Sequence, residues 1–328
     1  MKTRVNCFVA LLALQISFSA KPAKKAEPAA EIVSLRKVWD LAPHNAFTDL
    51  VRFQERWFLA FREGGKHASS DGSIRILTSA DADTWQTASV IRYPVADLRD
   101  PKIVVTPERK LMLTTAGAMH QSDAKHKTFA WFSINGRDWT DPVMIGDPNI
   151  WLWRVQWHRN KAYGLGYSTV EPHLLRSYVS ANGEKFQTLN PAVIEGDYAN
   201  ESSILFLPDD TALCLLRRDP KTALLGRSRP PYRGWEWKDT GVRVGGPHML
   251  RLDDGRIVAS VRLYDDRVRT SLCWVNPEDG TLTEFLALPS GGDTSYAGLA
   301  FHDELLHVSY YSSHEGRTSI YLAKVKLP

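Results

Sequence analysis

The sequence predicts an all-β protein, a six-bladed β-propeller of four-stranded antiparallel blades that is closed by an N-terminal strand. Three observations predict this fold. Beyond the N-terminal apolar segment the chain shows almost no helical periodicity, and its short alternating runs end at Gly, Asp, Asn or Pro. A two-strand pattern recurs six times along the chain. Three of these repeats also contain the same turn motif.

The repeated unit is clearest between Gly291 and Tyr311, GGDTSYAGLAFHDELLHVSYY. A polar turn, an alternating run, a His-Asp-Glu turn and a second apolar run predict two antiparallel strands. The corresponding positions in the first strands of the six units are Asp49, Asp100, Arg154, Glu201, His248 and Tyr296. The steps between them are 51, 54, 47, 47 and 48 residues, a period that suits one four-stranded blade.

The two ends of the repeat region predict how the ring closes. The last unit ends after its third strand, Thr318–Leu327, so one strand of that blade is missing. The segment Ile32–Leu41 precedes the first unit and has the pattern of a spare strand. Pairing these two segments would complete the sixth blade and remove the exposed edges. We therefore expect a single domain at residues 32–328, without an internal linker.

The N-terminal segment has the features of a secretory signal. A basic start precedes an apolar run from Cys7 to Phe18, and Ser17 and Ser19 supply small residues for cleavage. The run is too short to span a bilayer. We predict a signal peptide at residues 1–19 and a disordered tether at 20–31. The protein is then secreted or periplasmic, without membrane insertion after cleavage.

Charge and cysteine content narrow the function classes. The net charge is +4, from 41 basic and 37 acidic residues, so nothing favours a nucleic-acid partner. Outside the predicted signal, Cys214 and Cys273 both lie in apolar runs. They are expected to be buried free thiols, and a single disulfide between them remains the alternative.

Three turns share one pattern: Ser, any residue, Asp or Asn, and an aromatic residue four positions later. They are Ser79–Trp85, Ser133–Trp139 and Ser180–Phe186. The Asx side chain can bond the turn backbone while the aromatic ring packs between sheets, so we assign these turns a structural role. They resemble the Asp boxes of sialidases (neuraminidases), although they are one residue shorter. The resemblance covers most of the mature chain and implies a propeller that cleaves a terminal sugar from a glycan.

We call the start of the first strand of a blade, together with the loop between its second and third strands, the blade mouth. Polar residues at the six blade mouths form the candidate site. In an antiparallel blade, the start of the first strand and the loop between the second and third strands lie on one face, so these residues converge over the central channel. Glu201 opens a strand in ANESSILFLPDD, and Arg217 follows one hairpin later, as in sialidases. The resemblance implies that Glu201 is the base and that Arg217 binds substrate.

Tyr296 lies in GDTSYAGL, which is similar to the segment that carries the catalytic tyrosine of sialidases. A phenol needs a neighbouring carboxylate to accept its proton, and Glu201 is the candidate across the channel. Glycosidases with a tyrosine nucleophile are a known exception to the two-carboxylate mechanism, and the expected outcome is retention of configuration. The resemblance places the catalytic acid at Asp71, in KHASSDGSIRILTS, with His67 as a substitute.

Arginine positions both support the resemblance and depart from it. Arg262 falls where the family has another substrate-binding arginine, and Arg267 is the competing choice. Phe47-Thr48-Asp49, however, stands where sialidases have Arg-Ile-Pro, so the arginine that grips the sugar carboxylate is missing. Arg62 and Arg154 are the candidates to replace it, and the identity of the sugar stays open.

The remaining mouth residues, Asp49, Asp100 and His248, are expected to hydrogen-bond a sugar. Several histidines fall near the same face: His44, His67, His120, His126, His173, His248 and His314. None has the spacing of a known metal motif, so we predict no metal and no cofactor.

Trp151, Trp153 and Trp157 would share one face of their strand by alternation. Trp157 is expected in the core, and Trp151 or Trp153 is expected to stack on a sugar ring.

Two other functions stay open. A propeller can bind a carbohydrate or a protein without catalysis, because a fold does not by itself determine function. Arg99-Asp100-Pro101 alternatively suggests a furanosidase-like glycosidase that uses Asp49, Asp100 and Glu201, although such an enzyme would have five blades. The sequence therefore favours a secreted exo-glycosidase with a Tyr/Glu pair over these alternatives.

Overall fold

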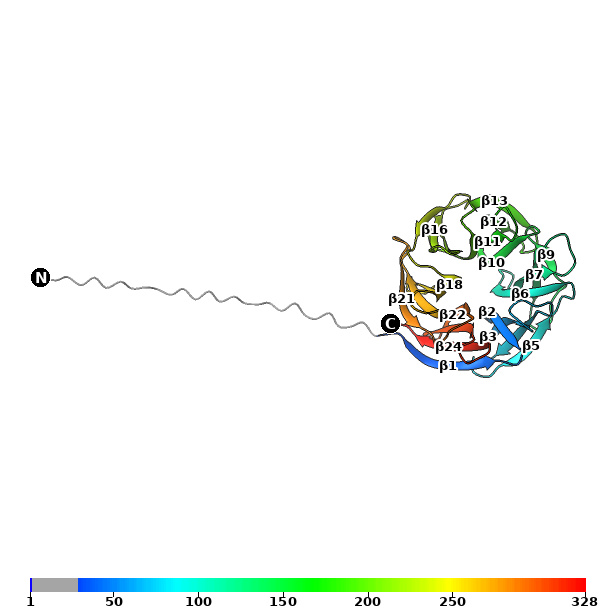
Figure 1. Cartoon of the computed structure of the whole chain (residues 1–328), viewed down its shortest axis with the longest axis horizontal. Coiled ribbons are helices and arrows are strands. Elements are labelled where there is room, and N and C mark those ends of the chain that lie inside the picture. The colour runs from blue at the N-terminus through cyan, green and yellow to red at the C-terminus, as the bar shows by residue number, and fades with distance from the viewer. Residues whose placement is uncertain (2–28) are drawn as a thin grey trace.

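The computed structural model describes residue 1 and residues 29–328, which form a ring of six four-stranded sheets around a central axis (Figure 1). This confirms the predicted all-β fold class and the number of blades. The predicted signal peptide and most of the predicted tether lie outside the described residues. In the described part of the chain, no helix is long and apolar enough to cross a membrane.

In each of the first five blades the strands follow one another in chain order from the axis outward. Blade 1 contains β2 (His44–Phe53), β3 (Arg56–Gly64), β4 (Ser73–Ser79) and β5 (Gln86–Ile91). Blade 2 contains β6 (Ala96–Val105), β7 (Leu111–Met119), β8 (His126–Ser133) and β9 (Val143–Ile145). Blade 3 contains β10 (Ile150–His158), β11 (Lys161–Ser168), β12 (Leu174–Ser180) and β13 (Phe186–Glu195).

The fourth and fifth blades repeat this order. Blade 4 contains β14 (Ala199–Phe206), β15 (Ala212–Arg218), β16 (Leu224–Ser228) and β17 (Glu236–Asp239). Blade 5 contains β18 (Gly245–Arg251), β19 (Ile257–Leu263), β20 (Arg269–Val275) and β21 (Leu282–Ala287).

The sixth blade is assembled from both ends of the described chain. It contains β22 (Thr294–His302), β23 (Leu305–Ser312) and β24 (Ser319–Lys326), and its outermost strand is β1 (Glu31–Trp39). β1 pairs antiparallel with β24, with Leu35 opposite Ala323. This is the predicted closure, although the strand begins at Glu31, the last residue of the predicted tether. The closing pair removes the free edge that β24 would otherwise expose.

The hydrophobic core lies between the blades rather than at the axis. Six clusters of buried apolar side chains sit mainly at the six interfaces between neighbouring blades, so each sheet buries both faces. Cys214 and Cys273 are buried in two of these clusters and are both free thiols. The prediction of buried free thiols is confirmed.

The three Ser-x-Asx turns have the same hydrogen bonds. Asp81 Oδ1 accepts the backbone N–H groups of Asp83 and Thr84, each at 2.8 Å, while Ser79 Oγ accepts that of Ala82 at 2.9 Å. Asn135 and Asn182 repeat the pattern with Ser133 and Ser180. The aromatic residues of these turns pack against three interblade clusters. The turns are therefore structural, as predicted.

The inner strands of blades 6 and 1 come into close contact at Gly298. A Cβ at this position would lie 2.2 Å from the backbone nitrogen of Leu50 and 2.7 Å from the carbonyl carbon of Asp49. Both neighbours are backbone atoms, so no side chain can rotate away. Only glycine allows β22 to approach β2 this closely.

We predict that Gly298→Ala lowers the free energy of unfolding by about 1–3 kcal/mol or more, because the added methyl group overpacks a rigid backbone contact. Gly234→Ala is the matched control, since a Cβ there meets no heavy atom within 4 Å. Chemical denaturation of both variants measures the difference. Equal midpoints for the two variants would contradict the close contact.

Candidate active site

Each inner strand contains a register shift that positions the site. The residues at these shifts, here called the bulge residues, are Phe47, Asp100, Trp153, Glu201, Gly246 and Tyr296. The residues that resume the pairing after the shifts are Asp49, Lys102, Arg154, Ser202, His248 and Gly298. A β-bulge adds one residue to a strand and re-aims the side chains around it. The six mouth positions aligned from the sequence therefore mix two structurally different sets.

Three of the residues after the bulges, Asp49, Arg154 and His248, form a largely buried polar cluster. Arg154 Nη1 lies 3.1 Å from Asp49 Oδ2, and Asp49 is 1% exposed. Asp49 also accepts the backbone N–H of Ile103 at 2.8 Å. His248 Nδ1 lies 3.0 Å from the carbonyl oxygen of Ala297, and burial lowers the pKa of His248 well below its ordinary value.

The sequence analysis expects Asp49, Arg154 and His248 to bind substrate, and this stays a prediction. In the structure Asp49 and Arg154 bind each other and His248 bonds the backbone, while the Nε of Arg154 is buried without a partner.

The predicted contact between Tyr296 and Glu201 is present. Tyr296 Oη donates a hydrogen bond to Glu201 Oε1 at 2.6 Å, across the channel from blade 6 to blade 4. Arg217 Nη1 lies 2.8 Å from Glu201 Oε1 and 3.1 Å from Tyr296 Oη. The backbone N–H of Gly246 donates to Glu201 Oε2 at 2.8 Å. Both carboxylate oxygens are therefore held in place.

The protonation states of this group follow from its contacts. Burial raises the pKa of Glu201, but Arg217, Tyr296 and the Gly246 N–H more than compensate, and the net pKa lies below its ordinary value. Burial, and then the charge of Glu201, raise the pKa of Tyr296 well above 10. The resting group is thus a neutral phenol that donates to a carboxylate. Such a carboxylate can accept the phenol proton when the oxygen reacts.

Tyr296 is held in an unusual backbone conformation. Its φ is +51°, and that of Ser295 is +97°, in a region that residues other than glycine rarely adopt. Gly246 has a φ of +54°, and a Cβ there would lie 3.0 Å from the Tyr296 ring. Gly246 therefore provides both the amide that binds Glu201 and the space for the phenol ring. Strained backbone of this kind is typical of functional sites.

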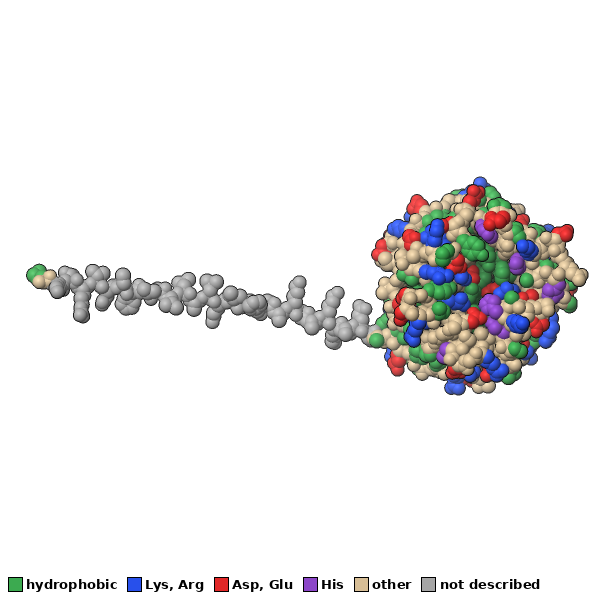
Figure 2. Space-filling view, viewed as in Figure 1, with side chains coloured by type: hydrophobic (Ala, Val, Ile, Leu, Met, Phe, Trp, Pro, Cys, Tyr) green, Lys and Arg blue, Asp and Glu red, His purple; other side chains and the backbone are tan. Residues whose placement is uncertain are grey.

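A pocket of about 300 Å³ opens beside Glu201 and Arg217 between blades 3 and 4. Its other lining residues are Trp151, Tyr167, Ser168, Thr169, His173, Tyr198, Ala199, Asn200 and Asp219. Figure 2 shows a central hollow with apolar, acidic and basic side chains around it. An apolar wall with a few convergent polar groups is typical of a small-molecule site.

Trp151 and Trp153 occupy different environments. Trp151 lines the pocket and stacks on Tyr167 at a centroid distance of 5.8 Å. Trp153 is 2% exposed and packs against Tyr296. Trp157 packs in a separate interblade cluster, so the three do not share one face as predicted. The bulge at Trp153 breaks the alternation on which that prediction rested.

Asp100 is a second carboxyl group of the site. It is 5% exposed, has a φ of +49°, and its Oδ1 is buried without a hydrogen-bond partner. Burial raises its pKa to about 6, with Glu201 adding to the rise, while Lys102 and Arg99 oppose it. Burial also lowers the pKa of Lys102 to about 8. Asp100 can therefore hold a proton near neutral pH, as a general acid must.

The loop between β3 and β4 carries His67 and Asp71, and β3 carries Arg62, all of which the sequence assigned to the site. Asp71 is exposed, and both its carboxylate oxygens accept the backbone N–H of Gly65 at 3.0 Å. Ser69, then Gly65, lower the pKa of Asp71, which favours its ionised form. Arg62 is fully buried, pairs with Asp97 at 2.8 Å and also bonds the loop at Lys66 and Ser69. Both side chains thus hold this loop in shape, and the acid role of Asp71 and the substrate-binding role of Arg62 stay predictions.

Arg262 and His67 are not among the residues that line this pocket. The Arg262 guanidinium donates to the carbonyl oxygen of Thr294 at 2.7 Å and lies 5.2 Å from the centre of the Tyr296 ring. His67 packs edge-on against Phe47 at 5.1 Å and bonds Asp293 at 2.9 Å.

Arg99 is a candidate that the sequence analysis did not assign to binding. Its guanidinium lies 5.5 Å from the Phe47 ring and 5.9 Å from the Trp151 ring, and its Nε is buried without a partner. Among the described residues it makes no hydrogen bond or ion pair, whereas Arg217 and Arg262 are engaged by protein acceptors. Its position next to Asp100 in the bulge is the only sequence signal that pointed to it.

Comparison with known proteins supports the fold. No protein-family model and no curated protein matches the chain. Among solved structures, a Dyadobacter fermentans protein of unknown function matches with a TM-score of 0.79 at 17% identity, covering 92% of this chain and 100% of that one. An α-L-arabinanase of Penicillium chrysogenum, solved with arabinobiose, matches with a TM-score of 0.70 at 13% identity, covering 90% and 99% of the two chains.

A sialidase of Trypanosoma rangeli also matches, with a TM-score of 0.69 at 10% identity, and covers 91% of this chain and 60% of that one. Similarity at these identities shows the fold alone. The chain has a β-propeller fold similar to that of glycoside hydrolases, and membership of the sialidase family is not established by it.

We predict that Asp100→Asn stabilises the protein progressively as the pH rises. The folded protein holds a proton on Asp100 up to about pH 6, whereas the unfolded chain loses it near 3.8. Between these values the native state binds more protons, so this group's contribution to stability falls as the pH rises. The asparagine variant has no proton to lose at this position, so its free energy of unfolding does not fall for this reason.

The free energy of unfolding of Asp100→Asn, relative to that of the wild type, should increase by about 3 kcal/mol between pH 4 and pH 7.5. Denaturant unfolding at several pH values measures it. Asp123→Asn, an exposed acid in the same blade, is the control and should show no such trend. A pH-independent difference for Asp100→Asn would contradict the raised pKa.

Proposed function

We propose that this protein is a glycoside hydrolase that releases a terminal sugar with retention of configuration. The observation that carries the proposal is the short contact between Tyr296 Oη and Glu201 Oε1, 2.6 Å, with Arg217 bonded to both atoms. A buried phenol that donates to an ionised carboxylate beside a pocket is suited to nucleophilic catalysis. The sialidase-like sequence pattern and the glycosidase structures that share the fold agree with this assignment.

In the proposed first step, Tyr296 Oη attacks the anomeric carbon while Glu201 takes the phenol proton. The bond to the leaving group breaks, and its oxygen receives a proton from Asp100. Arg217 keeps the new carboxylic acid and the bonded oxygen in position. The product is a sugar joined to Tyr296 with an inverted configuration.

The second step reverses these roles. The Asp100 carboxylate takes a proton from water, and the water oxygen attacks the anomeric carbon. Tyr296 leaves as its oxygen regains the proton from Glu201, and the second inversion restores the original configuration. Asp100 replaces Asp71 as the proposed acid, because its pKa is raised rather than lowered.

The pocket is suited to a single sugar ring. Trp151 and Tyr167 supply an apolar wall, and Asn200, Arg217 and Asp219 supply hydrogen-bonding groups on one side. The first-blade arginine that the resemblance implies is replaced by Phe47, which faces Tyr296 at 5.2 Å. Arg99 is the arginine left free to contact an acidic or hydroxyl group of the sugar.

A second candidate is a two-carboxylate, furanosidase-like glycosidase in which Glu201 is the nucleophile. The pKa of Asp100 is raised to about 6 while that of Glu201 is lowered, a division typical of an acid and a nucleophile. In this mechanism Tyr296 would only position Glu201. The two candidates therefore differ in what they predict for the phenol oxygen.

We predict that Tyr296→Phe and Glu201→Gln each reduce kcat for the cleaved glycoside by about 10²- to 10⁴-fold. This is the range for loss of an acid–base or nucleophilic group. A screen of purified protein against sialosides, arabinosides and other terminal glycosides identifies the substrate. Tyr310→Phe, a buried tyrosine of the same blade bonded to the carbonyl oxygen of Pro289, is the control.

Loss of activity in Glu201→Gln but not in Tyr296→Phe would replace the tyrosine mechanism by the two-carboxylate one. Release of no sugar by the wild type, together with measurable glycan binding, would instead favour a non-catalytic propeller.

A second prediction concerns Asp100 as the acid. Asp100→Asn should slow cleavage of natural glycosides strongly but spare aryl glycosides with acidic phenol leaving groups, since these depart without protonation. The wild-type rate on natural glycosides should fall above about pH 6, as Asp100 loses its proton. Comparison of kcat on both substrate types across pH measures this. Equal losses on both would contradict the role.

A further inference from the structure

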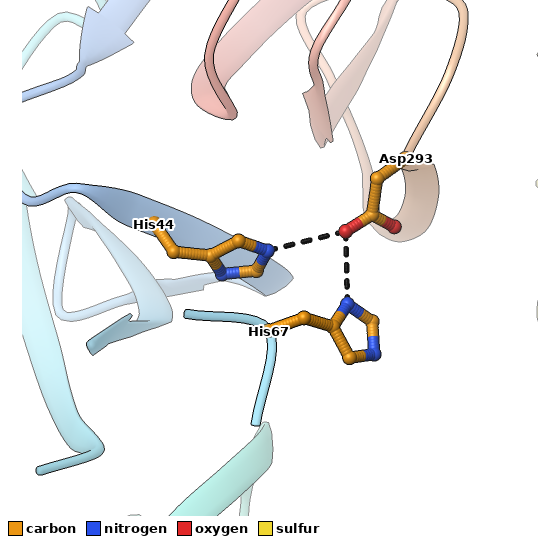
Figure 3. A group of neighbouring side chains, drawn as sticks. All are labelled: His44, His67 and Asp293. Atoms are coloured by element: carbon orange, nitrogen blue, oxygen red, sulfur yellow. Dashed lines mark hydrogen bonds and ion pairs between the residues drawn. The ribbon is translucent and has the colours of Figure 1, made fainter. Parts of the chain in front are cut away.

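We propose that His44, His67 and Asp293 form a binding site for a divalent transition-metal ion such as Zn²⁺ at the rim of the channel. One ligand atom from each residue lies within 4.8 Å of the other two. Figure 3 shows both imidazole rings directed at the same carboxylate. The site is separate from the Tyr296–Glu201 contact and does not depend on the proposed glycosidase activity.

The distances suit a metal centre. His44 Nε2 lies 3.1 Å and His67 Nδ1 2.9 Å from Asp293 Oδ2. In a tetrahedral zinc site with bonds of about 2.0–2.1 Å, neighbouring ligand atoms are roughly 3.3 Å apart. Each histidine nitrogen therefore needs to move only a few tenths of an ångström away from Asp293 Oδ2, and the two nitrogens lie within 4.8 Å of each other. Two imidazoles and one carboxylate leave a fourth position for water.

The three ligands differ in how firmly they are held. His44 begins β2 and is 9% exposed, and Asp293 immediately precedes β22. His67 lies in the loop between β3 and β4, and its side chain is 52% exposed. Two ligands are thus fixed by neighbouring blades, while the third can adjust. The exposed side of His67 also gives an ion a path from solvent.

The surroundings of Asp293 resemble the outer shell of a metal site. Tyr311 Oη donates to Asp293 Oδ1 at 2.6 Å, and Arg262 Nη2 lies 3.6 Å from the same oxygen. These groups hold Oδ1, so that Oδ2 is directed at the two histidines.

An ion at this site would connect the loop between β3 and β4 to blades 1 and 6. His67 packs on Phe47 at 5.1 Å, and Phe47 packs on Tyr296 at 5.2 Å. Fixing His67 would therefore fix one wall of the channel beside the candidate nucleophile. Sequence spacing could not reveal the site, because the histidines are 226 and 249 residues from Asp293.

The test is calorimetric titration of ZnCl₂ into the purified, untagged protein after treatment with a chelator and dialysis. We expect one ion per chain. His67→Ala and Asp293→Asn should each weaken binding by more than about 100-fold, since loss of even an outer-shell partner costs about 10- to 100-fold. Tyr311→Phe should fall in that smaller range. Zn²⁺ should also raise the Tm of the wild type but not of His67→Ala.

The matched control is His302→Ala, which removes a histidine that contacts a single carboxylate, Asp303, at 3.1 Å. It should bind Zn²⁺ like the wild type. Because His67 is exposed, its removal leaves the fold intact, and circular dichroism checks this. Equal Zn²⁺ affinity in the wild type and His67→Ala, or no binding by the wild type, would overturn the proposal. Neither result bears on glycoside cleavage, which is measured separately.

Discussion

The extra residue in each inner strand is the constraint on which the candidate site depends. At Phe47, Asp100, Gly246 and Tyr296 the bulge places the backbone at φ values between +49° and +60°. For residues other than glycine such conformations cost of order 1–3 kcal/mol each. They persist because the ring is closed and both faces of every blade are packed. The packing of the whole propeller thus offsets the cost of these backbone conformations, and the residues that adopt them lie at the channel.

Tyr296 shows how this constraint produces a preorganised site. Its ring is enclosed by Phe47 and Trp153, and its hydroxyl is fixed by Glu201 and Arg217. The phenol cannot rotate away from the carboxylate without breaking both sets of contacts. A reacting oxygen held in this way needs little reorganisation in the transition state.

Phe47 packs between several polar side chains at the channel. Its ring contacts those of Tyr296, His67 and Tyr311, and the rings of Tyr296 and Tyr311 lie 6.0 Å apart. The resemblance to sialidases implies an arginine at this blade mouth, and the apolar ring that replaces it also lies against the Arg99 guanidinium. In this chain blade 1 thus presents an apolar ring at this position, and the neighbouring guanidinium comes from blade 2.

The sequence by itself determined the fold, the number of blades and the closing strand. Each rests on local alternation and on a repeat of about 50 residues, and both patterns can be recognised in a single sequence. It also singled out Tyr296, Glu201 and Arg217, since each occurs in a motif of adjacent residues, and the structure brings these three side chains into contact.

Only the tertiary structure decided which mouth residues are paired within the protein. A bulge shifts the side-chain direction without changing the apolar pattern, so Asp49 and Asp100 looked equivalent although one is ion-paired and the other has no partner. The same holds for the cluster of His44, His67 and Asp293, whose members meet only when the first and last blades are brought together. Contacts across a closed ring leave no trace in the local sequence, because they depend on which blades become neighbours.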